Sequence, residues 1–104
     1  MTDFSYLNVD NAYKLINQKV TKTPLVTNDY INNLLEAEIY FKLENLQNTG
    51  SFKLRGATHK ITKLIETVKD SGVVAYSSGN HAQAVAYASM INSISAKIIM
   101  PKTA

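Results

Sequence analysis

Apolar residues recur every three or four positions in the first part of the chain, which is the spacing of one face of an α-helix. In residues 9–20 this face consists of Val9, Ala12, Tyr13, Ile16 and Val20. Asp10 or Asn11 is a candidate cap for the helix. Pro24 disfavours helical geometry at Thr23. The pattern therefore predicts a helix over 9–20, followed by a polar, asparagine-rich connection.

Two further stretches have the helical period. In residues 57–68 the apolar face consists of Ala57, Ile61, Leu64, Ile65 and Val68. In residues 80–92 the corresponding face is made of the small side chains Ala82, Val85, Ala86 and Ser89. Because a face of this kind allows close approach, we expect the helix over 80–92 to pack tightly on a sheet.

Three short segments have the character of β-strands. Residues 39–44, "IYFKLE", alternate apolar and polar positions, which predicts a half-buried strand. Residues 72–78, "GVVAYSS", suit a buried strand, and "AKIIMP" indicates a strand that stops at Pro101. The order from residue 39 onward is βαβαβ, which predicts an α/β fold with parallel strands.

Ligands bind beyond the carboxyl ends of the strands in such sheets, and two unusual segments fall there. The first, "TGSFKLRGA" (49–57), places Lys53 among small residues, where it is either a solvated cation or a group bonded to a bulky cofactor. The second, "SSGNH" (77–81), precedes a helix whose free N–H groups can bind a carboxylate or phosphate. The alternative for this segment is that Ser78 or Asn80 merely caps the helix.

Composition narrows the possible partners. The 104 residues are 45% hydrophobic and 18% charged, which is ordinary for one small globular domain. The net charge is +3 with scattered lysines, so we expect no nucleic-acid partner. The chain has no cysteine and only two distant histidines, His59 and His81, so no metal site is expected. The amino terminus lacks the pattern of a secretory signal, and no apolar run approaches the ~20 residues that span a bilayer. We therefore expect a soluble cytoplasmic protein without a membrane partner.

Three stretches taken together are much more specific than either loop alone: "KLENLQNTGSFKLRGA" (42–57), "SSGNHAQAVAYA" (77–88) and "MPKTA" (100–104). They resemble the fold-type II pyridoxal-phosphate enzymes, in the branch of the threonine/serine dehydratases (ammonia-lyases) and serine racemases. The resemblance runs from about residue 23 to the last residue. It implies that the chain forms an incomplete βαβαβ parallel-sheet portion of the tryptophan synthase β-like fold.

The resemblance also implies a role for individual residues. Lys53 matches the lysine that bonds covalently to pyridoxal 5'-phosphate and then acts as general base. Phe52 matches the aromatic residue beside the cofactor ring, and Asn80 matches the asparagine that hydrogen-bonds its phenolic oxygen. The loop that holds the substrate carboxylate corresponds to Ser77, Ser78, Gly79, Asn80 and His81.

The implied reaction is β-elimination from L-threonine or L-serine to a 2-oxo acid and ammonia. Ser78 keeps serine racemase activity open as an alternative, because serine racemase has serine here as a second acid/base group on the opposite face of the cofactor. Many of the similar bacterial dehydratases have alanine at this position. An alternative of another class is a non-catalytic module that binds an anionic metabolite or a partner through residues 77–81.

The resemblance further implies a division of the chain. Residues 1–38 would form an amino-terminal helix and connecting segment, and residues 39–104 a partial cofactor-binding α/β domain truncated at its carboxyl end. The family binds the cofactor phosphate in a glycine-rich loop, whereas the four glycines here are scattered. We therefore expect an amino-terminal fragment that is poorly stable or self-associates in isolation. The full-length enzyme is expected to be a homodimer or larger.

Overall fold

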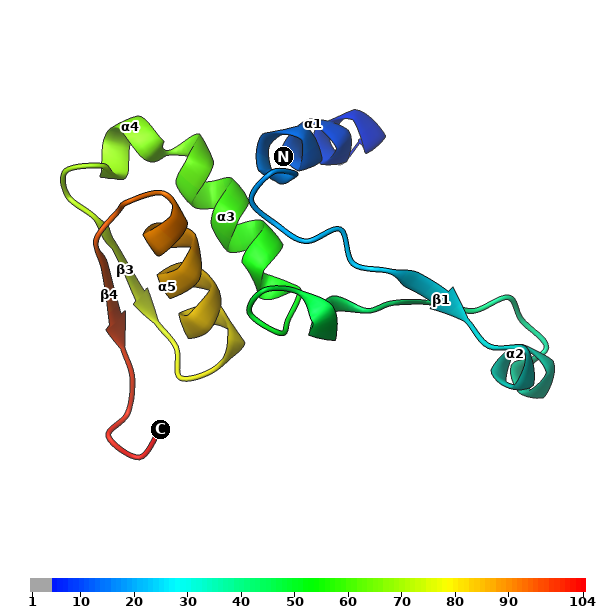
Figure 1. The fold of residues 1–104 in the computed structure, drawn as a ribbon. Helices are drawn as coiled ribbons and strands as arrows, with labels where there is room; N and C mark the ends of the chain where they lie inside the picture. The colour runs from blue at the N-terminus through cyan, green and yellow to red at the C-terminus, as the bar shows by residue number, and fades with distance from the viewer. Residues whose placement is uncertain (1–4) are drawn as a thin grey trace.

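The computed structural model describes residues 5–104, which form a helix-and-sheet body and a projecting arm (Figure 1). The body contains α3 (Lys53–Lys63), β3 (Val73–Tyr76), α5 (Asn80–Ile91) and β4 (Ala96–Ile99). Strands β3 and β4 are parallel, with Val73 opposite Ala96 and Tyr76 opposite Ile99. Helix α5 connects the two strands and packs on both of them and on α3. The second half of the predicted βαβαβ order is therefore confirmed as a β3–α5–β4 unit.

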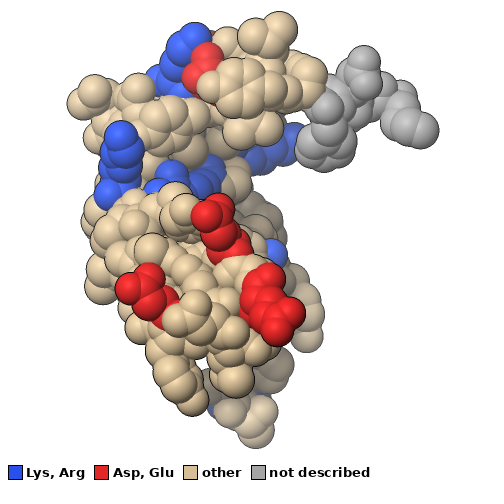
Figure 2. Space-filling view, turned by 90° about the vertical axis from the view of Figure 1, so that its right-hand side faces the viewer, with Lys and Arg blue, Asp and Glu red and all other residues tan. Residues whose placement is uncertain are grey.

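The arm contains β1 (Leu25–Thr27), α2 (Asp29–Leu35) and β2 (Tyr40–Lys42). Strand β2 pairs antiparallel with β1 and not with the parallel sheet. The prediction of a half-buried parallel strand over 39–44 was therefore wrong in both partner and burial, since every residue of β1 and β2 is exposed. Figure 2 faces the arm side, where most of the visible acidic groups lie in the middle and lower parts, one lies at the top beside basic groups, and most basic groups lie in the upper part.

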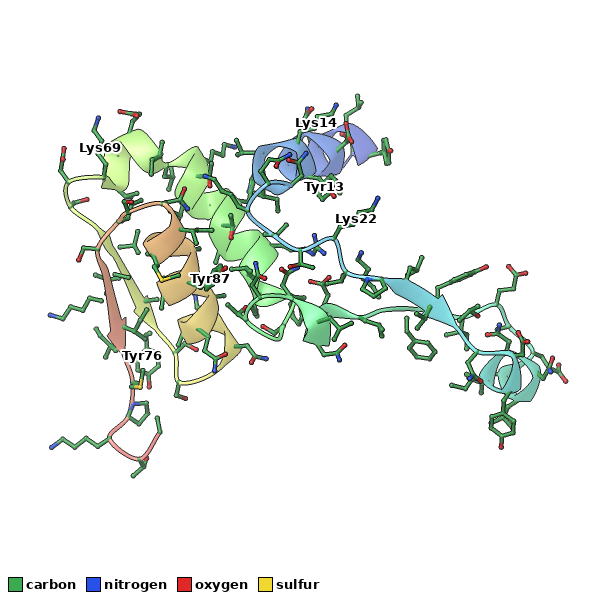
Figure 3. All side chains as sticks on the ribbon, viewed as in Figure 1. Tyr13, Lys14, Lys22, Lys69, Tyr76 and Tyr87 are labelled. Atoms are coloured by element: carbon green, nitrogen blue, oxygen red, sulfur yellow. The ribbon has the colours of Figure 1, made fainter. Side chains whose placement is uncertain are left out.

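The amino-terminal helix α1 (Tyr6–Ile16) begins and ends earlier than the predicted 9–20. Its cap is Ser5, whose hydroxyl accepts a hydrogen bond from the Asn8 N–H at 3.3 Å. The predicted cap at Asp10 or Asn11 was wrong, because both residues lie inside the helix. Asp10 instead pairs with Lys14, which is labelled in Figure 3, at 2.6 Å.

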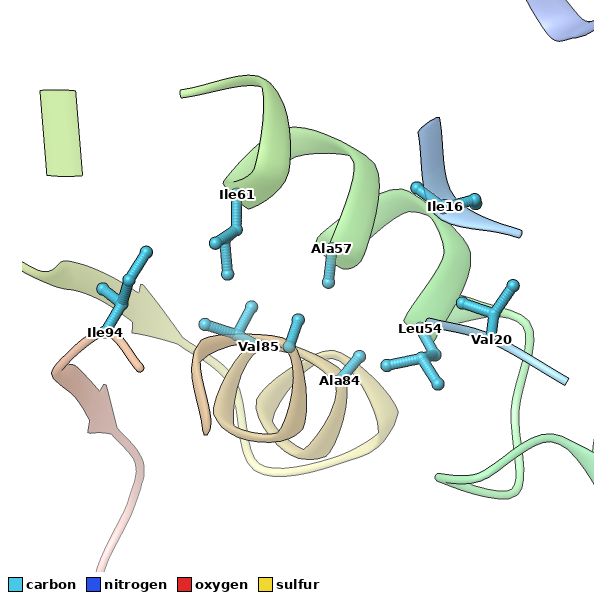
Figure 4. Packing of buried hydrophobic residues seen from close by; sticks show 9 residues of the cluster. Ile16, Val20, Leu54, Ala57, Ile61, Ala84, Val85 and Ile94 are labelled. Carbon is cyan, nitrogen blue, oxygen red and sulfur yellow. The ribbon is translucent and has the colours of Figure 1, made fainter. Parts of the chain in front are cut away.

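The core lies between α3 and α5, with a contribution from the end of α1 and the residues after it (Figure 4). Its buried residues are Ile16, Val20, Leu54, Ala57, Ile61, Ala84, Val85, Ala88 and Ile94. The small side chains of Ala84 and Ala88 allow α5 to approach its neighbours closely. The predicted small-residue face is slightly displaced, because Ala86 is exposed.

Three smaller differences concern the helix starts and strand burial. Helix α3 begins at Lys53, four residues before the predicted start, and Leu64 interrupts the predicted 57–68 helix before a short α4 (Ile65–Val68). A 3₁₀ turn, η1 (Glu44–Leu46), follows β2. Strand β3 is only half-buried, since Val74 is 69% and Tyr76 75% exposed.

Among residues 5–104 no helix combines the length and apolar character needed to cross a lipid bilayer.

Candidate active site

Lys53 is the first residue of α3, and its side chain is exposed. Its ammonium group lies 5.4 Å from the centroid of the Phe52 ring, close enough for a cation–π contact. Phe52 itself is 62% exposed. The structure thus places the predicted cofactor-bonding lysine and its aromatic neighbour together on the surface, at the start of a helix.

The backbone of the loop before Lys53 is held by hydrogen bonds, whereas the Lys53 side chain is exposed. Gly50 has a φ of 71°, which disfavours residues with a side chain. The Gln47 side chain bonds both backbone groups of Thr21, accepting from its N–H at 2.8 Å and donating to its carbonyl at 2.9 Å. The buried hydroxyls of Thr49 and Ser51 have no hydrogen-bond partner within the described part of the chain. The loop therefore brings two unsatisfied hydroxyl groups close to Lys53 in sequence.

Lys53 and His81 line one groove of about 560 Å³ between α3, the start of α5 and β3. Gly56 and Ala57 are the small residues in its wall. Much of the remaining lining is apolar and comes from Ile61, Leu64, Val68, Val73, Val74, Ala75 and Val85. Helices α3 and α5 begin at the same end of the body, where β3 also ends (Figure 1). This arrangement joins the two segments that the sequence singled out.

Helix α5 has Gly79 at its N-cap position and no side-chain cap. Ser77 accepts a hydrogen bond from the Gly79 N–H at 3.3 Å, and neither Ser78 nor Asn80 caps the helix. Helices α1 and α2, in contrast, are capped by Ser5 and Asn28. Gly79 is exposed, and a Cβ atom built on it would meet nothing within 4 Å, so there is open space beside this residue. Uncapped N–H groups and open space are what an anion needs at a helix start.

The remaining predicted site residues are not brought into the groove. Phe52 and the four residues Ser77, Ser78, Gly79 and Asn80 do not contribute to its lining as described for residues 5–104. Ser78 and Asn80 are exposed in the loop before α5. Their roles beside a cofactor and a substrate stay predictions.

The ion pair between Arg55 and Glu44 was not predicted from the sequence. Arg55 donates to Glu44 through Nε at 2.9 Å and through Nη2 at 2.7 Å. The Arg55 hydrogen bond, with a further one from Thr23, lowers the pKa of Glu44 from its ordinary 4.5 to about 2 despite the opposing effect of burial. The same pair raises the pKa of Arg55. The two residues lie in different elements, η1 and α3, so the period of one helix or strand could not relate them.

Comparison with known proteins places these motifs in a family. Residues 16–104 match the family described as pyridoxal-phosphate dependent enzymes. The chain is 44% identical over 104 residues to serine racemase of Dictyostelium discoideum, covering all of this chain and 32% of the racemase. It is 52% identical over 95 residues to the biosynthetic L-threonine dehydratase of Lactococcus lactis, covering 91% of this chain and 23% of the dehydratase.

A solved structure agrees with the sequence matches. The crystal structure of the Dictyostelium discoideum serine racemase superposes with a TM-score of 0.89 at 46% identity, covering 94% of this chain and 32% of that one. The chain therefore spans about a third or less of the length of these relatives.

The residues around Lys53 fit the attachment of pyridoxal phosphate. An amine on the first turn of α3 borders a groove large enough for a flat ring, with small residues at Gly56 and Ala57. The unpaired buried hydroxyls of Thr49 and Ser51 offer polar groups in the same loop. With residues 16–104 matched, the chain belongs to the fold-type II pyridoxal-phosphate dependent enzymes, a family whose cofactor is pyridoxal phosphate.

Proposed function

We propose that this chain supplies the lysine-bearing region of a pyridoxal-phosphate-dependent ammonia-lyase, a threonine/serine dehydratase. The observation that carries the proposal is the shared groove of Lys53 and His81 beside the uncapped start of α5. The similarity to a threonine dehydratase supports the choice of reaction. The substrate would be L-threonine or L-serine, and the products a 2-oxo acid and ammonia.

In this proposal each group has a defined task. Lys53 would hold the cofactor through its amine and, when the amine is free, would take the α-proton of the substrate. The first-turn N–H groups of α5, with Ser77, Ser78 and His81, would bind the substrate carboxylate. Asn80 would donate a hydrogen bond to the phenolic oxygen of the cofactor, and Phe52 would contact the cofactor ring. When bound, pyridoxal phosphate supplies an electron sink for the charge left by the α-proton.

Serine racemase activity is the second candidate, favoured by the serine at position 78. Ser78 is exposed before α5, and Lys53 begins the neighbouring helix. If the two groups lie on opposite faces of the bound substrate, a proton can leave to one and return from the other. The similarity to the Dictyostelium discoideum serine racemase supports this candidate.

Cofactor attachment tests the shared part of both candidates. The purified chain is mixed with pyridoxal phosphate, its visible absorbance is recorded, and the adduct is reduced with borohydride and mapped by peptide. We expect a visible band and a label on Lys53. Formation of a 2-oxo acid from L-threonine or L-serine by the whole enzyme then reports the elimination.

Lys60 provides the matched control, because it is an exposed lysine that lines the same groove. Lys60→Ala should keep both the band and the label, whereas Lys53→Ala should lose them. A label spread evenly over the surface lysines would count against the enzyme and favour a non-catalytic module that binds anions or a partner through residues 77–81.

A further inference from the structure

We propose that the Glu44–Arg55 ion pair positions Lys53, because it holds the first turn of α3 and so sets the direction in which the Lys53 amine meets the groove. The inference rests on the function proposed above, since it assigns a consequence to the geometry of the cofactor-bonding lysine. Glu44 and Arg55 are positioning residues in this proposal and do not touch the cofactor.

The first turn of α3 has no side-chain cap. Phe52 stands at its N-cap position with helical backbone angles and makes no side-chain cap. Four N–H groups at a helix start lack partners within the helix, so an uncapped first turn frays readily. A lysine at the first helical position would then point in many directions. The turn therefore needs a restraint from elsewhere in the chain.

Arg55 supplies that restraint from the same turn. Its Nε and Nη2 atoms contact the two carboxylate oxygens of Glu44 at 2.9 and 2.7 Å, a two-pronged geometry that fixes orientation as well as distance. Nη2 also lies 3.2 Å from the Thr21 carbonyl oxygen. The side chains are 25% and 15% exposed for Arg55 and Glu44, so solvent competes only partly for the pair. One guanidinium thus ties α3 to η1 and to the segment after α1.

The backbone on each side of Lys53 is anchored while its side chain is not. Leu54 is fully buried in the core, and Ser51 is only 7% exposed. Glu44 is itself held, because Thr23 donates a hydrogen bond to its carboxylate. Lys42 in turn donates to the Thr23 carbonyl oxygen at 2.6 Å. The result is an exposed amine on a restrained backbone, which is the arrangement needed for directed covalent attachment.

Lys19 gives the control for a purely structural role. Its amine donates to Thr62 at 3.0 Å and to Asn92 at 2.6 Å, so it holds the last part of α3 to the end of α5. Loss of Lys19 should loosen the same helix without affecting its first turn. A comparison of the Glu44–Arg55 ion pair with the Lys19 hydrogen bonds therefore separates the general stability of α3 from the direction of Lys53.

The first experiment needs no cofactor. Amide hydrogen exchange is measured on the full 104-residue chain and on the variants Glu44→Gln, Arg55→Lys and Lys19→Met, below the melting temperature of each. We expect exchange to rise about tenfold or more in the first two variants at Arg55, whose N–H bonds to the Phe52 carbonyl, and at residues 57–59, whose N–H groups bond back to the first turn of α3, with α5 little changed. Lys19→Met should instead affect residues 60–63 and 89–92. Unchanged exchange at Arg55 and at residues 57–59 in Glu44→Gln and Arg55→Lys would overturn the proposal.

The second experiment tests whether the Glu44–Arg55 ion pair affects the reactivity of Lys53. Each variant is treated with limiting pyridoxal phosphate and borohydride, and the share of label on Lys53 is compared with that on Lys60. We expect the Lys53 share, and the circular dichroism of the visible band, to fall about tenfold in Glu44→Gln and Arg55→Lys but not in Lys19→Met.

The outcomes distinguish the two proposals. Selective label on Lys53 in the unaltered chain that persists in Glu44→Gln and Arg55→Lys would overturn the positioning role and leave the proposed function standing. Equal losses in all three variants would also overturn it, because a general loosening of α3 would then explain the effect. Absence of selective label in the unaltered chain would count against the proposed function and remove the positioning role with it.

Discussion

Arg55 grips both carboxylate oxygens of Glu44, from Nε at 2.9 Å and from Nη2 at 2.7 Å, across a loop of ten residues that contains Lys53. The contact joins the two ends of this segment, and Gly50 allows the turn within it through its φ of 71°. The lysine expected to bond the cofactor thus lies two residues before Arg55, on a backbone that the ion pair ties to η1.

This pair should make stability sensitive to acid. The pKa of Glu44 is lowered from 4.5 to about 2, mainly by the Arg55 hydrogen bond. The contribution of the Glu44 carboxylate to the free energy of unfolding is therefore present above pH 4.5 and is lost as the pH falls toward about 2, because Glu44 of the unfolded chain takes up its proton first. Allowing for solvent screening, we expect on the order of 1–2 kcal/mol. Thermal melting from pH 7 to 2.5 measures the effect, and the difference between the native chain and Glu44→Gln should shrink below pH 4.5. A constant difference would contradict the assignment.

Leu54 should be the most costly single truncation in the first turn of α3. Its side chain is fully buried against the α5 face. Leu54→Ala removes this packing and leaves a cavity, so we expect a loss of about 2–5 kcal/mol in the free energy of unfolding. Leu46→Ala is the control, because Leu46 is 54% exposed and its loss should cost about 0.5 kcal/mol or less. Denaturant unfolding gives both values, and similar costs would show that the core lies elsewhere.

Two glycines should respond to alanine with opposite signs. Gly72 has a φ of 75°, and a Cβ there would lie 2.7 Å from the Ser95 carbonyl oxygen. Gly72→Ala should therefore destabilise the chain by more than about 1 kcal/mol. Gly56 lies inside α3 with nothing within 4 Å of an added Cβ, so Gly56→Ala should stabilise it by about 0.5–1 kcal/mol. Melting temperatures decide the matter, and a stable Gly72→Ala chain would contradict the described turn.

Ser78 should separate the two candidate reactions. Under the racemase proposal, Ser78→Ala removes the second acid/base group, so racemisation of serine by the whole enzyme should collapse while elimination from the L-amino acid persists. A loss of about 10²-fold or more is expected for a general acid/base group. Ser71→Ala, an exposed serine at the other end of β3, is the control. If racemisation survives in Ser78→Ala, Ser78 is not the second group.

Some features were accessible from sequence because they depend on neighbours along the chain. The apolar period at Ala57 and Ile61 predicts a helix that packs by that face, and both residues are buried in α3. The β-branched run before Ser77 predicts a strand, and Gly79 marks the start of the next helix. The motifs around Lys53 and Asn80 indicated the family, which the matched residues confirm.

The sequence predicted the helices α1, α3 and α5 and the strands β3 and β4, with shifted ends, because backbone preference and side-chain period are local properties. It missed β1 and α2, which lie in the segment expected to be a polar connection. Only the tertiary structure decided that Tyr40 pairs with Thr27 in a projecting antiparallel arm, since alternation predicts an extended chain but not its hydrogen-bonding neighbour. The bond between Glu44 and Arg55 likewise required the fold, because it joins two separate elements, η1 and α3, across the loop between them. Contacts between residues far apart in the sequence depend on how the elements pack, and local sequence patterns do not determine that packing.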